Sequence, residues 1–299
     1  MNPAKMICLI GEQPIPNLLP IRHYHPQQIA LIYSAKTKKI GANLAQMVSG
    51  IPISYYQIDE SELLAPFDLI TAQRLLQAWL QQQNWQSHEL LFNVTGGTKP
   101  MSLAAARLAE RYQSPMIYLQ SEGSKNWLYK YEFQQGLLTL TERAELGSLI
   151  NIDDYYKVYG LSKFTFSPDK EPLEKIILQA LQPHVDEIIK GVSFGAALEI
   201  DLTIRCGNQV GIAEVKTGGS AKGRKGLDQL NTAAQREYFG TFTKRFLIID
   251  QPLGTDIHAL ATAQGVIVIH LLDDWKNGLS PADAEALINT VTAALGVKK

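Results

Sequence analysis

Short apolar runs alternate with stretches of helical periodicity along the first half of the chain. Around Leu44, Leu76 and Leu108, apolar side chains recur every three or four positions, the spacing that buries one face of a helix. The intervening runs have the character of strands and cover residues 6–10, 29–33, 53–57, 90–94 and 116–119. Strands and helices that alternate in this way form parallel sheets, so residues 1–150 predict a doubly wound, Rossmann-like α/β domain. Two further runs, 127–133 and 137–141, predict a closing hairpin.

The pattern changes after residue 150. Residues 151–168 have no clear helical or strand period, and we predict a linker there. Residues 169–299 then predict a second domain whose elements come in the order αβββαβ, with an addition at the end. The predicted ranges are 172–181, 187–194, 198–206, 210–216, 226–238, 245–249, 257–263, 266–270 and 281–295.

Composition and charge narrow the class of protein. The 299 residues are 45% hydrophobic and 19% charged, which is ordinary for a folded globular protein. Lys and Arg total 28 against 29 Asp and Glu, so any contact with nucleic acid must be local. Two cysteines supply neither a disulfide framework nor a zinc-site spacing. Because no apolar run approaches the length of a signal core or membrane span, we expect a cytoplasmic protein without a membrane partner.

Acidic residues and a lysine meet on two neighbouring predicted strands. Asp201 lies on the strand 198–206, Glu214 and Lys216 end the next strand, and a glycine turn joins the two. Antiparallel pairing about that turn brings together residues whose numbers sum to about 415, so Asp201 faces Glu214. Adjacent carboxylates raise each other's pKa unless a cation lies between them. We therefore predict that Asp201 and Glu214 bind Mg²⁺ or Mn²⁺, and that Lys216 orients the attacking water or neutralises phosphoryl charge.

This arrangement resembles the PD-(D/E)XK nuclease superfamily, whose restriction-endonuclease-like core is αβββαβ. The family's acid on the second strand corresponds to Asp201, and its (D/E)XK tripeptide corresponds to Glu-Val-Lys at 214–216. Ile200 stands where the motif has its proline, a departure that is common in the superfamily. The resemblance implies two further catalytic residues, Glu174 on the preceding helix and Gln229 on the following one. It also implies a metal-dependent endonuclease that hydrolyses phosphodiester bonds.

A cationic, glycine-rich segment follows the tripeptide. Lys222, Arg224 and Lys225 lie among four glycines, and we predict that they bind nucleic acid through its phosphates. A solvated turn is the alternative interpretation of this segment.

A glycine turn marks the first half. The segment runs from a strand into a helix that has Pro100 in its first turn, and its residues are Thr95, Gly96, Gly97, Thr98 and Lys99. Outward-pointing backbone N–H groups and a helix amino terminus favour an anion such as a ribose phosphate. The spacing of the glycines matches neither the dinucleotide-binding fingerprint nor the P-loop. The sequence therefore lacks the motifs that would favour hydride transfer or nucleotide hydrolysis. A plain turn between a strand and a helix remains the alternative.

Other candidate ligand residues follow strands that end at the same sheet edge, where open α/β sheets bind ligands: Gln13, Pro14, Ser34 and Thr37. The first half resembles the CARF domain, the Rossmann-like sensor of CRISPR-associated proteins, through segments 17–20, 34–37 and 93–101. The resemblance implies a homodimer that binds a cyclic oligoadenylate across its two-fold axis, with the tetra-adenylate favoured by symmetry. Residues 95–99 would hold the ribose-phosphate ring with help from Ser34 and Thr37, and Gln13 and Pro14 would lie near the adenines.

Together the two halves resemble the ligand-activated effector nucleases of type III CRISPR antiviral defence. The resemblance implies allosteric activation, in which the ligand draws the nuclease domains into an arrangement that cleaves DNA, RNA or both. One alternative is a ligand-controlled regulator whose nuclease fold binds nucleic acid without cleaving it. Another is a first domain that degrades its own ligand.

Overall fold

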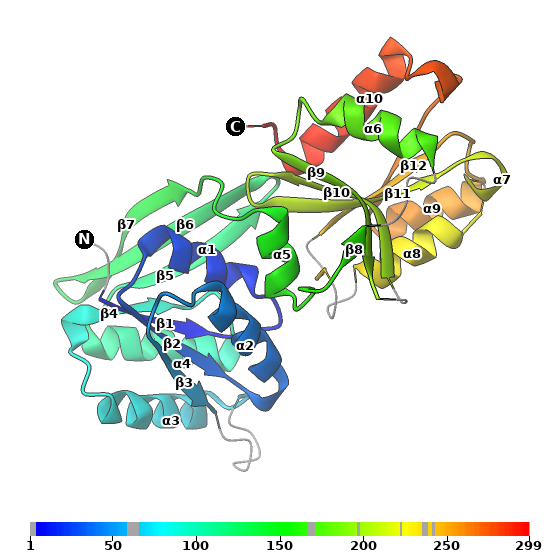
Figure 1. Ribbon diagram of the computed structural model, residues 1–299. Helices are drawn as coiled ribbons and strands as arrows, with labels where there is room; N and C mark the ends of the chain where they lie inside the picture. The colour runs from blue at the N-terminus through cyan, green and yellow to red at the C-terminus, as the bar shows by residue number, and fades with distance from the viewer. Residues whose placement is uncertain are drawn as a thin grey trace. The chain divides into compact units, whose positions relative to one another are not determined.

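The computed structural model of the chain describes residues 4–58, 66–166, 171–195, 198–221, 223–234, 239–240 and 243–298. It divides into two compact units, each built on one sheet (Figure 1). The first unit comprises Met1–Glu122 and Asn126–Leu149, and the second comprises Gly123–Lys125 and Ile150–Lys299. The predicted class, an α/β protein with two sheets, is confirmed.

The sheet of the first unit has the strand order β3-β2-β1-β4-β5-β6-β7. Its strands are β1 (Lys5–Leu9), β2 (Gln28–Tyr33), β3 (Ile53–Gln57), β4 (Leu90–Asn93), β5 (Met116–Glu122), β6 (Lys125–Gln134) and β7 (Leu137–Glu145). Pairing is parallel from β3 through β5, and β6 and β7 form the predicted antiparallel hairpin. The strand order reverses between β1 and β4, so the ends of these two strands form the switch point at which such sheets bind ligands.

Four helices of the first unit cover this sheet: α1 (Ile15–Tyr24), α2 (Lys38–Met47), α3 (Leu69–Gln82) and α4 (Lys99–Tyr112). Helices α3 and α4 pack over a core that includes Ile7, Phe92 and Leu108. Leu103 shares helix α4 with Leu108 but is 56% exposed, so not every apolar residue of this helix lies in the core. Helix α1 was not predicted, because its two prolines and its nearly complete burial hide any apolar period.

The sheet of the second unit has the order β13-β12-β11-β10-β9-β8. Its strands are β8 (Thr165–Phe166), β9 (Glu187–Phe194), β10 (Leu198–Cys206), β11 (Gln209–Lys216), β12 (Lys244–Ile249) and β13 (Val266–His270). Strands β8 to β11 are antiparallel, and β11, β12 and β13 are parallel. The predicted order of strands is confirmed from β9 onward.

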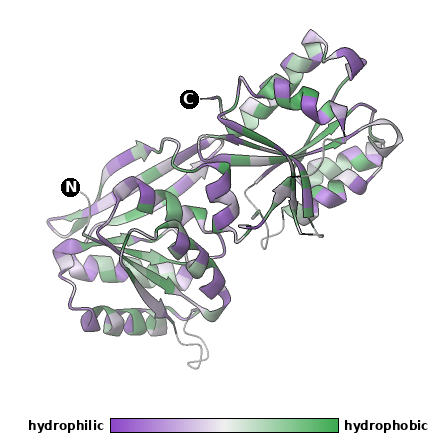
Figure 2. Ribbon diagram, viewed as in Figure 1, coloured by the Kyte–Doolittle hydropathy of each residue, from purple (hydrophilic) through white to green (hydrophobic). Residues whose placement is uncertain are grey.

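Helices lie on both sides of this second sheet (Figure 1). They are α5 (Ile152–Val158), α6 (Pro172–Leu181), α7 (Gly218–Ala221), α8 (Lys225–Ala233), α9 (Thr255–Ala263) and α10 (Pro281–Leu295). Helices α6 and α10 share a core with β10 and β12 that includes Ile177, Ile204, Phe246 and Val291. Figure 2 shows that in both units the central strands are mostly hydrophobic, whereas the helices carry both hydrophobic and hydrophilic residues. No helix among the described residues is long and apolar enough to cross a membrane.

The segment predicted to be an irregular linker, 151–168, contains α5 and β8 instead. A helix of seven residues is too short for a period to stand out, and such a helix depends on its cap and on tertiary packing. Asn151 caps α5, and Ile152, Tyr155 and Tyr156 are buried.

Candidate functional site

Strands β10 and β11 hold the predicted acidic pair in the expected register. Leu202 pairs with Ala213 and Thr203 with Ile212, so Asp201 and Glu214 come next along the two strands. The Oδ2 atom of Asp201 accepts a hydrogen bond from the backbone N–H of Val215 at 2.7 Å. Strand β11 therefore fixes the carboxylate of Asp201 and leaves its second oxygen for another partner.

Glu214 and Lys216 lie on the side of the sheet that α8 covers. Glu214 is only 2% exposed, and Lys216 Nζ forms an ion pair with Glu214 Oε1. Gly226 of α8 packs directly on this pair, because a Cβ there would lie 3.4 Å from Cγ of Lys216 and 3.7 Å from Cγ of Glu214. The glycine lets the helix approach the site closely.

Burial dominates the electrostatics of these carboxyls. It raises the pKa of Glu214 to about 8 with the help of the Asp201 charge, although the Lys216 ammonium acts in the opposite direction. Burial likewise raises the pKa of Asp201, while the Val215 N–H and Lys216 counteract it. Glu174 of α6 belongs to the same cluster, because burial and then the charge of Asp201 raise its pKa to about 7.

Lys216 remains a cation in this environment. Burial alone would lower its pKa, but the neighbouring carboxylates, led by Glu214, outweigh that effect and raise the pKa. The side chain therefore supplies positive charge and hydrogen-bond donors at neutral pH.

Gln229 lies three residues beyond Gly226 on α8, on the wall of a cavity of about 410 Å³. The lining residues are Leu198, Glu199, Lys225, Asp228, Gln229 and Thr232. The Oε1 atom of Gln229 is buried and has no hydrogen-bond partner among the described residues. A buried acceptor without a hydrogen bond costs free energy, so Gln229 Oε1 is suited to accept a hydrogen bond from a water or from a ligand.

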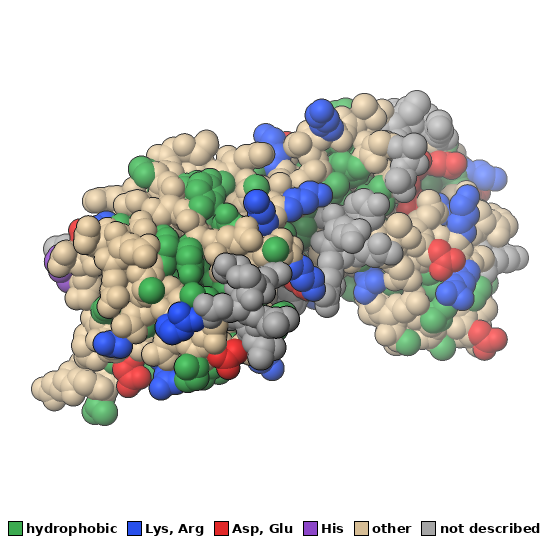
Figure 3. All heavy atoms as spheres, turned by 90° about the horizontal axis from the view of Figure 1, so that it is seen from below, with side chains coloured by type: hydrophobic (Ala, Val, Ile, Leu, Met, Phe, Trp, Pro, Cys, Tyr) green, Lys and Arg blue, Asp and Glu red, His purple; other side chains and the backbone are tan. Residues whose placement is uncertain are grey.

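Lys222, Arg224 and Lys225, the residues predicted to bind phosphates, differ in their surroundings. Arg224 is exposed but forms an ion pair with Asp228 at 3.0 Å, and Lys225 lines the cavity. Lys222 lies outside the described residues. On the face drawn in Figure 3, basic and acidic side chains are interspersed, consistent with the near balance of total charge.

The donor set of Asp201 and Glu214 fits a hard divalent cation. Mg²⁺ and Mn²⁺ take carboxylate oxygens and usually keep several waters or substrate phosphates, so two protein carboxylates suffice. A cation would also relieve the repulsion that raises the pKa of both groups. Within the described ranges, no group of three or more His, Cys, Asp or Glu side chains is arranged to hold a metal ion.

In the first unit, the glycine turn lies tightly over the end of β1. A Cβ at Gly96 would meet the carbonyl oxygen of Leu9 at 2.0 Å, and Gly97 has a φ of +77°. Only glycine fits this backbone, which brings the N–H groups of the turn to the switch point.

Two buried asparagines, whose contact with each other was not predicted, hold this turn. Asn93 Nδ2 donates to Asn17 Oδ1 at 3.0 Å, and Asn17 Nδ2 donates to the carbonyl of Leu9 at 2.9 Å. The backbone N–H of Thr95 donates to Asn93 Oδ1 at 3.1 Å. A polar residue at the end of the otherwise apolar strand 90–94 was the available signal.

The predicted ligand residues follow β1, β2 and β4, whose parallel pairing brings their ends to one edge. Several hydroxyls already accept backbone N–H groups: Thr95 from Leu119 at 2.8 Å, Thr98 from Met101 at 3.3 Å and Thr37 from Ser34 at 3.1 Å. Lys99 is exposed at the start of α4, whereas Pro14 is buried at the start of α1. Lys99 is therefore the most exposed of the predicted ligand residues.

The fold and these two sites define a class of protein, one that joins a Rossmann-like domain with a glycine turn at its switch point to a second α/β domain that carries an acidic pair beside a lysine. Residues 6–155, just over half of the chain, match the family model described as the Card1 CARF domain. The chain belongs to this family.

Solved structures share the fold over the whole chain. Can2 from Sulfobacillus thermosulfidooxidans, in complex with cyclic tetra-adenylate, matches with a TM-score of 0.71 and 16% identity over 98% of this chain and 97% of its own. Protein VC1899 from Vibrio cholerae matches with a TM-score of 0.70 and 15% identity over 98% and 99%. A type III CRISPR defence DNA nuclease activated by cyclic oligoadenylate matches at 0.63 and 13% identity, over 100% of this chain and 53% of its own. A comparison with curated protein sequences finds no match.

Proposed function

We propose that this chain is a nuclease of type III CRISPR antiviral defence that is activated by a cyclic oligoadenylate and requires Mg²⁺ or Mn²⁺. The observation that carries the proposal is that Asp201 lies opposite Glu214 on two neighbouring strands, with Lys216 beside Glu214. Membership of the Card1 CARF family supports the sensor function. The shared fold of Can2, whose structure contains cyclic tetra-adenylate, supports the choice of ligand.

The activator would bind at the switch point of the first unit. Backbone N–H groups of the glycine turn and the amino terminus of α4 offer positive potential to a phosphate, and Lys99 adds a full charge. A homodimer with two such turns across its axis would match the symmetry of a cyclic tetra-adenylate. Ser34 and Thr37 would assist through their hydroxyl groups, with Gln13 and Pro14 near the adenines.

Asp201 and Glu214 would hold the cation through carboxylate oxygens, and Asp201 Oδ1 is the oxygen that the Val215 hydrogen bond leaves available. When bound, the cation would polarise the phosphate and lower the pKa of a water. Lys216, which stays protonated, would stabilise negative charge on the phosphoryl oxygens. Glu174 has a pKa of about 7 and is suited to accept the proton of the attacking water. Gln229 would orient that water or the substrate through its unpaired Oε1.

The substrate would be DNA, RNA or both. Lys222, Arg224 and Lys225 would contact its phosphates, which is a sequence-independent mode of binding that weakens as salt concentration rises. The Asp228 partner of Arg224 would compete with the substrate for that guanidinium.

A cleavage assay with Mn²⁺ tests the proposal, using single- and double-stranded DNA and RNA with and without cyclic tetra-adenylate. We expect ligand-stimulated cleavage that EDTA abolishes and that Glu214→Gln lowers by about a hundredfold or more. Glu285→Gln, a matched substitution at an exposed site on α10, should cleave as the wild type does. Cleavage that survives Glu214→Gln would refute the site, and ligand-dependent binding of nucleic acid without cleavage would favour the regulator instead.

A further inference from the structure

Helix α5 is fastened to the strand that carries Asp201. The hydroxyl of Tyr156 donates to Thr203 Oγ1 at 2.8 Å, and both residues are fully buried. Thr203 lies two residues beyond Asp201 on β10, so the two side chains project from the same face of the strand. The ring of Tyr156 is enclosed edge-to-face by Phe164, Phe194 and Phe239, which fixes its orientation.

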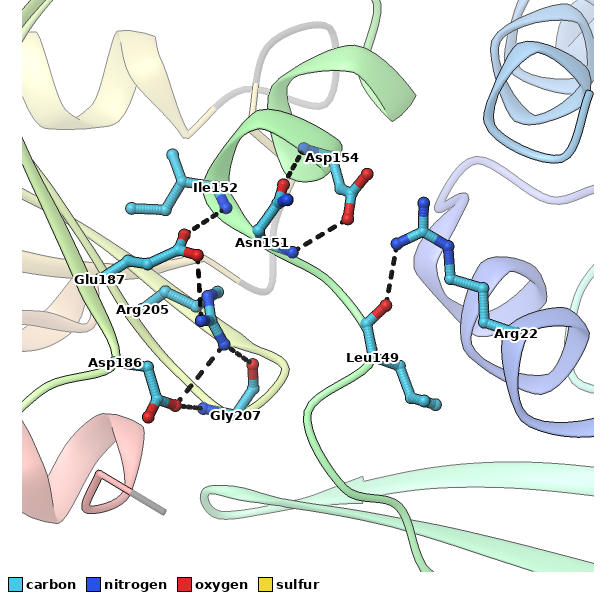
Figure 4. Close-up of polar contacts among 9 residues, drawn as sticks. All are labelled: Arg22, Leu149, Asn151, Ile152, Asp154, Asp186, Glu187, Arg205 and Gly207. Atoms are coloured by element: carbon cyan, nitrogen blue, oxygen red, sulfur yellow. Dashed lines mark hydrogen bonds and ion pairs between the residues drawn. The ribbon is translucent and has the colours of Figure 1, made fainter.

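A second contact fastens the first turn of α5. The backbone N–H of Ile152 donates to Glu187 Oε2 at 2.7 Å, and Arg205 Nη2 forms an ion pair with Glu187 Oε1 at 3.2 Å (Figure 4). Arg205 is 6% exposed and also reaches Asp186 at 3.5 Å and the carbonyl of Gly207 at 2.6 Å. Because Arg205 belongs to β10, Glu187 links the start of α5 to the strand that carries Asp201.

The first unit grips the chain just before α5. Arg22, in the last turn of α1, donates from Nη1 to the carbonyl of Leu149 at 2.8 Å (Figure 4). The chain passes into the second unit at Ile150, so only Ile150 and Asn151 separate the Arg22 contact from the Glu187 contact. Two residues provide little slack, so a displacement of Leu149 would be transmitted to the start of α5.

Helix α1 also leads back to the glycine turn. Asn17, in its first half, bonds to Asn93, which in turn accepts the N–H of Thr95. A ligand that moves the turn would therefore move α1 through this buried pair, and with it Arg22. A series of polar contacts, joined by helix α1 and by residues 150 and 151, links the glycine turn to β10. We name it the connecting path, and its residues are Thr95, Asn93, Asn17, Arg22, Leu149, Ile152, Glu187 and Arg205.

We propose that the connecting path couples the glycine turn to the nuclease site, and that Tyr156 is a positioning residue that acts on Asp201 through Thr203. The proposal rests on the proposed function, since it describes how the same nuclease site is regulated. In one state α5 holds β10 so that Asp201 faces Glu214 productively, and ligand binding favours this state over another. A ligand shifts such an equilibrium only as far as it binds one state better than the other.

Three substitutions in the full-length chain test this. Arg22→Gln breaks the hold on Leu149, and Tyr156→Phe removes only the hydroxyl that reaches Thr203. Arg111→Gln is the matched control, because Arg111 also donates to an oxygen within the first unit, Gln77 Oε1, but lies off the connecting path. Each variant is assayed for binding of cyclic tetra-adenylate by calorimetry, and for cleavage with Mn²⁺ with and without this ligand.

We expect Arg22→Gln to bind the ligand with wild-type affinity and to keep the unstimulated rate, while its stimulation by ligand falls about fivefold or more. Tyr156→Phe should lose stimulation to a similar degree, and Arg111→Gln should match the wild type. Should Tyr156→Phe fail to fold, Arg22→Gln alone decides the question. Wild-type stimulation in Arg22→Gln would overturn the connecting path.

Amide hydrogen exchange separates this proposal from the proposed function, because it does not depend on cleavage. Ligand should change exchange at residues 152–156 and 202–206 in the wild type but not in Arg22→Gln. Stimulated cleavage without that change would overturn the coupling and leave the nuclease assignment intact. The change without any cleavage would overturn the nuclease assignment and support the coupling. A wild type that does not bind cyclic tetra-adenylate would overturn both.

Discussion

The carboxylate of Asp201 accepts the backbone N–H of Val215 at 2.7 Å, just beyond the paired positions Leu202 and Ala213. The Asp201 side chain thus takes the place of a backbone carbonyl as the partner of the Val215 N–H, next to the last paired residues of β10 and β11. The same contact orients Asp201 toward Glu214. Structure and candidate chemistry therefore depend on one hydrogen bond.

Substitutions at Asp201 should separate its contribution to stability, through the Val215 hydrogen bond, from its contribution to cleavage, through its charge. Asp201→Asn keeps an oxygen that can accept the Val215 N–H but removes the charge, so we expect a stable protein with little cleavage. Asp201→Ala leaves that N–H without its partner, which should destabilise the second unit by about 1–3 kcal/mol. Thermal unfolding and the Mn²⁺ cleavage assay measure the two effects. Equal melting temperatures for the Ala and Asn variants would contradict the structural role.

The stability of the metal-free protein should fall as pH rises. Burial raises the pKa of Glu214 from 4.5 to about 8, so within that window the folded protein binds more protons than the unfolded chain. The free energy of unfolding therefore decreases with increasing pH across the window, and it is highest at the acidic end of it. Melting temperatures of the EDTA-treated protein between pH 5 and pH 8 test this.

Glu214→Gln should flatten that pH dependence, because its amide does not titrate. Mn²⁺ should reverse the loss at pH 8 in the wild type, since it stabilises the ionised carboxylates that bind it. If Glu214→Gln had the same pH dependence of the melting temperature as the wild type, Glu214 would not be the group that causes this dependence.

Gly96→Ala should disrupt the glycine turn. The added Cβ would meet the Leu9 carbonyl at 2.0 Å, so the backbone must shift, at a cost of about 1–3 kcal/mol. We expect a lower melting temperature and loss of cyclic tetra-adenylate binding by calorimetry. Gly50→Ala is the control, because no atom lies within 4 Å of its Cβ position. Ligand binding retained in Gly96→Ala would remove the turn from the candidate site.

Much of the second domain could be predicted because its signals are local. The turn at Gly207 and Asn208 determined the register of β10 with β11, and side-chain alternation then placed Glu214 and Lys216 together. The strands from β9 to β13 were long and apolar enough to stand out.

The elements that escaped prediction are those whose stability comes from distant partners. Helix α5 has seven residues, and its Tyr156 is fixed by aromatic rings from three other segments. Likewise Asn17 and Asn93 are 76 positions apart, and nothing local indicates that they bond. A single sequence carries no record of such pairs.

The sequence by itself determined the order of the main strands, the glycine turn and the acidic pair, because strand alternation and turn geometry act over a few residues. Only the tertiary structure decided that Asp201 is held by the Val215 N–H, that Glu214 is buried enough to raise its pKa, and that α5 is bound to β10. Burial and long-range hydrogen bonds depend on which segments meet in space, and local pattern does not specify those meetings.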